Sequence, residues 1–170
     1  MNESKLDQLL THRREAQQNI VNVNEPLVQL VVFALGHEWF AFHGERISEI
    51  LSPTEVFFVP GGPPSLEGVI NVRGEIESVI RPHDMLHLSD SGVGQASSIL
   101  MGRGASMRSG IRVDRIIDVI EVGQSNIQAS PSSLPEPMRN YVLGVLRLQE
   151  RPVAVLDLDT LFADYARGLG

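Results

Sequence analysis

The sequence contains no cysteine and a single lysine among its 170 residues. Without cysteine, the chain cannot form disulfides, thiolate metal sites or a cysteine nucleophile. The lysine, Lys5, lies in a segment that reads as an N-terminal tail. A P-loop requires a Gly-rich turn ending in Lys-Ser or Lys-Thr, and a Schiff-base enzyme requires a desolvated lysine. The rest of the chain can build neither, so several large enzyme classes are excluded.

The sequence also lacks basic excess and long apolar runs. Its formal net charge is −7, which argues against binding nucleic acid by phosphate neutralisation. The longest apolar stretch, around Leu30 to Leu35, is far shorter than the roughly 20 residues of a membrane helix. The polar N-terminus leads into no apolar signal segment. We therefore predict a soluble, cytoplasmic protein with no nucleic-acid partner and no direct membrane insertion.

Residues 1–26 differ from the rest of the chain. Ser4 stands three residues before Asp7, as in a capping box at a helix start, and the segment ends in the helix-breaking sequence 22–26. Apolar residues fall roughly on one helical face between these signals: Leu6, Leu9, Leu10, Ala16 and Ile20. Two interpretations stay open, a frayed polar tail or an amphipathic helix that docks on the body or on a partner.

From Leu27 onward the pattern is one of short strands separated by turns. The predicted strands are 27–35, 39–42, 47–51, 56–59, 69–72, 76–80, 98–101, 107–113, 116–122, 141–148 and 153–158. Proline-rich loops are predicted at 60–64 and 129–137. A short C-terminal helix is predicted at 158–167, with Leu158, Leu161, Phe162 and Tyr165 on its inner face. The fold class is therefore all-β.

The two halves of the body resemble each other. Ile47–Leu51 is similar in type and order to Ile116–Ile120, and Gly68–Ile70 is similar to Gly144–Leu146. Short strands at this spacing are typical of small barrels, in which closure hides the strand edges. We predict two similar barrels side by side, the first at about 27–90 and the second at about 95–157, joined by a Ser/Gly/Asp-rich bridge.

Few catalytic options remain, because no Gly-x-Ser-x-Gly elbow occurs in the sequence. His83 and His87 are spaced i and i+4 with Asp84 between them, so a short helix could present them to a metal ion. The alternative, a solvated polar face, is favoured because no third ligand is evident. Asp157 and Asp159 flank one strand residue, and Asp159 is interpreted as the cap of the last helix rather than as an acid–base group.

Three arginines are candidates for binding a partner. Arg108 and Arg112 alternate along one predicted strand, so both guanidinium groups face the same side, where they could bind an acidic partner or simply be solvated. Arg73 lies near the apex of a predicted hairpin, in a turn where Asn71 and Gly74 permit tight backbone geometry.

At this hairpin the chain resembles the CheW family of chemotaxis adaptors. The sequence Asn71-Val72-Arg73-Gly74, following Gly68-Val69-Ile70, is similar to the signature hairpin of the family. Further stretches agree in order between Leu27 and Asp164: 33–36 with Phe40, 46–50, 110–119, 141–145 and 152–158.

The resemblance implies two SH3-like five-stranded barrels with short connecting and C-terminal helices, and a non-catalytic adaptor without cofactors. It implies that the chain couples the cytoplasmic tip of a methyl-accepting chemoreceptor to the regulatory domain of a CheA-type histidine kinase. The groove between the barrels is expected to take the receptor tip. An edge of the first barrel is expected to meet the kinase through Ile47, Glu49 and Ile50, with Arg73 at the signature arginine position.

The sequence departs from the family pattern after the hairpin. The family usually has Pro-Val-x-Asp-Leu there, whereas this chain has Ser78-Val79-Ile80-Arg81-Pro82. An arginine thus replaces a carboxylate, which leaves flagellar chemotaxis and another chemosensory-like pathway both open. The rival hypothesis from a different class is a small metal-dependent enzyme built on His83, Asp84 and His87.

Overall fold

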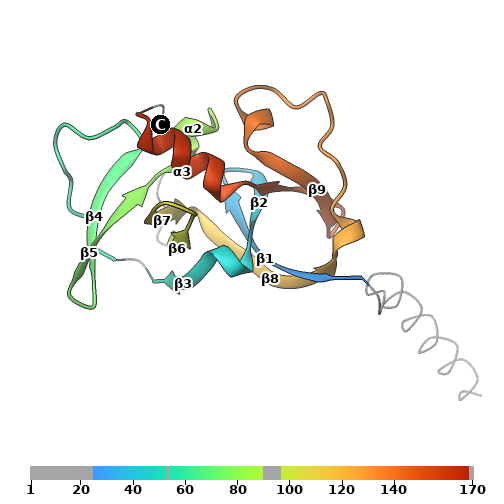
Figure 1. Ribbon diagram of the computed structural model, residues 1–170, viewed down its shortest axis with the longest axis horizontal. Coiled ribbons are helices and arrows are strands. Elements are labelled where there is room, and N and C mark those ends of the chain that lie inside the picture. Colours follow the sequence, from blue (N-terminus) through green and yellow to red (C-terminus); the bar gives the residue numbers. More distant parts are fainter. Residues whose placement is uncertain (1–24, 53, 90–96, 169–170) are drawn as a thin grey trace, which may run out of the picture.

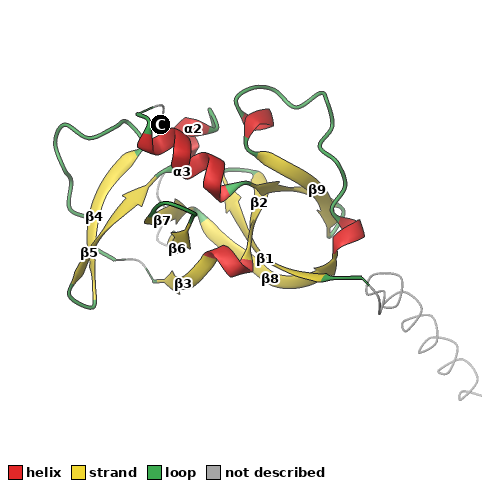
Figure 2. Cartoon of the chain, viewed as in Figure 1, coloured by secondary structure: helices red, strands yellow, loops and turns green. Residues whose placement is uncertain are grey.

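The structure is a computed structural model that describes residues 25–52, 54–89 and 97–168. Within these ranges ten strands form two five-stranded mixed sheets, with the orders β8-β1-β2-β10-β9 and β3-β6-β7-β5-β4 (Figures 1 and 2). The strands are β1 (Leu27–Leu35), β2 (Glu38–His43), β3 (Ile47–Leu51), β4 (Leu66–Val72), β5 (Glu75–Ile80), β6 (Ser98–Arg103), β7 (Arg108–Val113), β8 (Arg115–Gly123), β9 (Val142–Leu148) and β10 (Arg151–Leu156).

The helices are α2 (Pro82–Met85), α3 (Leu158–Ala166) and three 3-10 turns, η1 (Gly44–Arg46), η2 (Gln124–Asn126) and η3 (Met138–Asn140). Every helix in the described ranges is too short or too polar to cross a bilayer. The predicted all-β fold class is confirmed, as is the C-terminal helix, whose residues Leu158, Leu161 and Phe162 are buried. The predicted N-terminal tail at 1–26 lies, except for its last two residues, outside the described part of the chain.

Both sheets close into barrels in the same way. After β3, Phe57 exchanges two backbone hydrogen bonds with Val69 of β4, at N···O distances of 2.8 and 2.9 Å. After β8, Gln128 pairs identically with Val145 of β9, with both distances 2.9 Å. In each case the segment that leaves one edge strand covers the opposite edge, so few strand edges stay open. We call the β8-β1-β2-β10-β9 sheet barrel A and the β3-β6-β7-β5-β4 sheet barrel B.

The predicted division of the chain into barrels at 27–90 and 95–157 does not match the strand pairing. Barrel B is continuous, from β3 to β7, and is inserted between β2 and β8 of barrel A. The reason is that β1 pairs with β8 across about half of the chain, and β2 pairs in parallel with β10 across more than half of it. The repeat itself is present, since β3, β4 and β5 occupy the same positions in barrel B as β8, β9 and β10 in barrel A.

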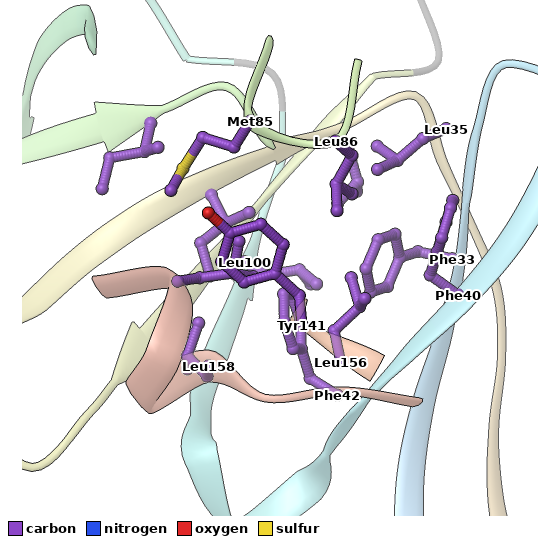
Figure 3. Close-up of a cluster of buried hydrophobic side chains, with 14 of the residues drawn as sticks. Phe33, Leu35, Phe40, Phe42, Met85, Leu86, Leu100, Tyr141, Leu156 and Leu158 are labelled. Atoms are coloured by element: carbon purple, nitrogen blue, oxygen red, sulfur yellow. The ribbon is translucent and has the colours of Figure 1, made fainter. Parts of the chain in front are cut away.

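Three hydrophobic clusters hold the fold together. One lies inside barrel A and includes Trp39 and Val155, and one lies inside barrel B and includes Ile70 and Met101. The largest, which we call the central core, combines residues of both barrels with α2 and α3 (Figure 3). In Figure 3, Phe33 and Phe42 converge with side chains from four other segments: Met85, Leu86, Leu100, Tyr141, Leu156 and Leu158. The largest hydrophobic cluster is therefore formed jointly by the two barrels.

Two local predictions need correction. Residues 56–59 form no strand; only Phe57 pairs, through the closing bridge described above. The cap of α3 is Asp157, whose carboxylate accepts hydrogen bonds from the backbone N–H and the hydroxyl of Thr160 at 3.3 and 2.8 Å. Asp159 instead pairs with Arg46 at 2.9 Å, because its position in the first turn of the helix directs its side chain outward.

Candidate partner-binding surface

The turn between β4 and β5 positions Arg73. Both residues of this two-residue turn have positive φ, 51° for Arg73 and 88° for Gly74, which is the type I′ geometry of tight hairpins. The side-chain oxygen of Asn71 accepts a hydrogen bond from the backbone N–H of Gly74 at 2.8 Å. Asn71 and Gly74 thus hold the backbone, and Arg73 projects from the tip of the hairpin.

Arg73 forms a bidentate ion pair with Glu49 of β3. Its Nη2 lies 2.6 Å from one carboxylate oxygen and its Nη1 lies 3.1 Å from the other. The Glu49 side chain is 26% exposed and the Arg73 side chain 71% exposed. The hydrogen bonds to Arg73 lower the pKa of Glu49, and the same bonds raise the pKa of Arg73. The pair therefore stays charged through the neutral range, and most of the Arg73 side chain remains exposed.

Large apolar side chains are exposed on the same barrel. Ile50, the neighbour of Glu49 on β3, is 44% exposed, and Ile76, which pairs with Asn71, is 67% exposed. Phe57 and Phe58, which follow β3, are 53% and 77% exposed. Exposed apolar groups together with an oriented arginine are the composition typical of protein–protein interfaces. We call Glu49, Ile50, Asn71, Arg73, Gly74 and Ile76 the hairpin surface.

The structure brings together most of the predicted site residues but separates three of them. Ile47 is partly buried and packs against the central core. Arg108 lies against Glu77 of β5, with its Nε 3.4 Å from the carboxylate.

Arg112 is buried and does not form an open site for an acidic partner. It donates to Glu67 at 3.0 and 3.1 Å and to the Ser97 hydroxyl at 3.1 Å. The predicted strand alternation is correct, but the face that carries Arg112 also carries Gly110, whose Cα lies against the barrel B core. The carboxylate that binds Arg112 therefore belongs to this chain, on Glu67. The prediction that Arg108 and Arg112 form a solvent-facing pair is wrong.

The residues of the metal hypothesis do not converge. His83 is buried, and its Nε2 lies 3.1 Å from a carboxylate oxygen of Asp114. Helix α2 ends at Met85, and His87 has a φ of 53°, so the i, i+4 helical geometry does not extend to it. Among the described residues, no group of three or more His, Cys, Asp or Glu side chains could hold a metal ion.

Sequence reasoning missed the exposed apolar residues Phe57, Phe58 and Ile76. A signal was available for the first two, because neighbouring residues of an extended chain point to opposite sides and a single core cannot bury both. No such signal indicated that Ile76 is exposed. Strand β5 is short, and its apolar residues Ile76, Val79 and Ile80 do not alternate regularly with polar ones.

The structure defines a two-barrel β module with a candidate partner-binding surface on barrel B. Comparison with known proteins places it more narrowly. The model of the CheW-like domain family matches residues 29–166. The chain is 32% identical to the chemotaxis protein CheW of Treponema pallidum, over 91% of each chain, and 26% identical to that of Helicobacter pylori, over 81% of this chain and 83% of the other.

The crystal structure of the scaffolding protein TtCheW from Thermoanaerobacter tengcongensis has the same fold. It superposes with a TM-score of 0.73 at 24% identity, over 82% of this chain and 90% of that chain. The chain belongs to the CheW-like family. It is a chemotaxis adaptor and not an enzyme, and its partners belong to the chemotaxis signalling array.

Proposed function

We propose that the chain couples the cytoplasmic tip of a chemoreceptor to the regulatory domain of a CheA-type histidine kinase, and that it does so in the cytoplasm. The hairpin surface of barrel B is the kinase contact. The observation that carries this assignment is the bidentate Glu49–Arg73 pair at the tip of a rigid turn, with Ile76 of the same hairpin exposed. An arginine held in place loses little conformational freedom on binding, which favours its use at an interface.

The receptor contact is proposed at the junction of the barrels. Ile47 of barrel B and Ile116 of barrel A are both partly buried against the central core, so each leaves apolar surface at this junction. Helical partners bind such apolar surfaces through residues spaced along one face. Arg81, which replaces the carboxylate usual in the family, is half-buried between β5 and α2.

The kinase contact predicts a specific effect of Arg73→Ala. The variant should keep the far-UV circular dichroism spectrum and the unfolding midpoint of the wild type, because the pair is exposed. Its affinity for the kinase should fall at least tenfold, because a pre-organised charged contact is lost. The measurement is titration calorimetry of the full chain against the purified kinase, followed by co-sedimentation with receptor-containing membranes.

Arg103→Ala is the matched control, because Arg103 is an exposed arginine at the end of β6 in the same barrel. It should bind the kinase as the wild type does. Undiminished affinity of a folded Arg73→Ala variant would contradict the hairpin assignment. If the wild type itself bound neither kinase nor receptor, the coupling proposal as a whole would fail.

A further inference from the structure

Barrel A carries an apolar cavity of about 360 Å³ between its strands β2 and β10 and the proline-rich segment 131–138. Along β10, Val153 and Val155 point into the barrel, so the alternation directs Pro152 and Ala154 outward. These two residues, with Phe40 and Val145, form the floor of the cavity. The wall is the proline-rich segment after η2, through Pro131, Leu134, Pro135 and Met138. Cavities of this size and composition are typical of ligand sites.

Trp39, which lines the cavity, carries a buried hydrogen-bond donor without an acceptor in the described residues. The residue is 8% exposed, and the donor is its indole Nε1. Buried indole N–H groups are normally paired, because an unmade hydrogen bond leaves the cost of desolvation uncompensated.

The cavity also contains an oriented cation. The guanidinium carbon of Arg151 stands 4.5 Å from the centroid of the Trp39 ring, and its Nη2 donates to the backbone oxygen of His37 at 2.6 Å. Arg151 forms no ion pair with any residue in the described ranges. Its remaining N–H groups are held in a planar fork that suits a carboxylate. The acidic residue Glu38 also lines the cavity and opposes an anion there.

The cavity continues into a second, more polar depression of about 620 Å³. Pro131, Val145 and Pro152 line both, so the two are adjacent along the β9–β10 hairpin. Ser125 and Gln128 line the second depression and offer hydrogen bonds to a backbone. A single small molecule would fill only the first part, whereas an extended peptide would use both.

We infer that this groove binds an extended peptide segment of a partner protein, with a large apolar side chain in the cavity beside Trp39 and a neighbouring carboxylate on Arg151. The groove lies on barrel A, and the hairpin surface lies on barrel B. The peptide site therefore shares no residue with the proposed kinase contact.

The test uses the full chain and the signals of Trp39, which is its only tryptophan. The indole N–H resonance and the fluorescence are followed while the peptide Ac-Phe-Asp-NH₂ is added. A saturable change is expected, and Ac-Phe-Asn-NH₂, which lacks the charge, should bind about tenfold more weakly because the carboxylate contact is lost. Absence of a saturable change, or equal affinity for the two peptides, would overturn the inference without any variant being needed.

Variants of the chain and a small carboxylic acid, 3-phenylpropionate, test the inference further. Arg151→Gln should weaken the binding of Ac-Phe-Asp-NH₂ about tenfold, because it removes a positive charge from the cavity. Glu38→Gln should strengthen that binding, because it removes a negative charge that repels the carboxylate of the peptide. Arg115→Gln, an exposed arginine of β8 outside the groove, should bind as the wild type does. If 3-phenylpropionate bound as tightly as the peptide, the site would take a small acid and the peptide inference would be rejected.

Discussion

Three arginines of barrel B show how position decides what an identical side chain does. Arg73 projects from a turn and keeps most of its surface in water. Arg108, on a strand, is partly covered and lies beside Glu77. Arg112 is buried at 5% exposure and satisfied by Glu67 and Ser97. Arg112 has no donors available for another protein, because a buried charge must use its hydrogen bonds internally.

Tyr141 gives a pH-dependent prediction at the scale of one residue. Its hydroxyl donates to Asp164 at 2.7 Å, and burial together with this hydrogen bond raises the pKa of Tyr141 to about 12. The pKa of a tyrosine in an unfolded chain is about 10. The folded state therefore binds the phenolic proton more tightly, and the resulting stability is complete below about pH 10 and lost as the pH rises toward 12.

We expect Tyr141→Phe to lower the free energy of unfolding by about 1 kcal/mol at neutral pH. It should also flatten the fall in stability between about pH 10 and 12. The measurement is urea unfolding at several pH values, with tyrosinate absorbance recorded on the folded protein. Tyr165→Phe is the control. The pKa of Tyr165 is also raised, but its cause is burial alone, without a hydrogen bond to a carboxylate. An unchanged pH profile in Tyr141→Phe would contradict this account.

At the scale of elements, the two barrels share a structural requirement at the segment where each of them closes. Gly68 and Gly144 occupy equivalent positions, and a Cβ on either would meet backbone of the closing segment: Phe57 O at 2.2 Å and Gln128 O at 2.7 Å. The corresponding hairpins also share a turn type, since Gln149 and Glu150 have positive φ as Arg73 and Gly74 do. These glycines are needed because two backbones approach each other there.

Gly68→Ala should therefore destabilise the protein, because a methyl group would collide with backbone that cannot rotate away. We expect a loss of about 1–3 kcal/mol in the free energy of unfolding, measured by urea titration. Gly62→Ala is the control; its Cβ would meet only the end of the flexible Leu66 side chain. Equal stability of Gly68→Ala and Gly62→Ala would show that the closing segment is not held against β4.

At the scale of the whole molecule, the inserted topology makes the barrels interdependent. Barrel A cannot form until β8 to β10 have met β1 and β2, and barrel B lies between them in the chain. Asp114, at the passage from β7 to β8, contacts His83 and accepts a hydrogen bond from Gly36 N at 2.5 Å. The central core then buries residues of both barrels against α3.

We expect the full chain to unfold in one cooperative transition, since losing either barrel exposes the shared core. Trp39 fluorescence reports on barrel A, and far-UV circular dichroism reports on both barrels. Their urea curves should coincide. Two separated transitions would mean that the barrels are stable independently.

The amino-acid sequence by itself determined the local structure and the family. Strands β1 and β3 lie where alternation and turn residues predict them, because these signals act over a few residues. The Asn71–Gly74 turn was recognisable for the same reason, and its arginine could be named as a candidate.

Tertiary structure decided which strands share a barrel, that Arg112 is internal while Arg73 is exposed, and that Trp39 and Arg151 meet beside an apolar cavity. All three depend on pairings between residues far apart in the chain, such as β2 with β10. A local pattern contains no information on such pairings, because the free energy that selects them comes from burial shared across the whole molecule.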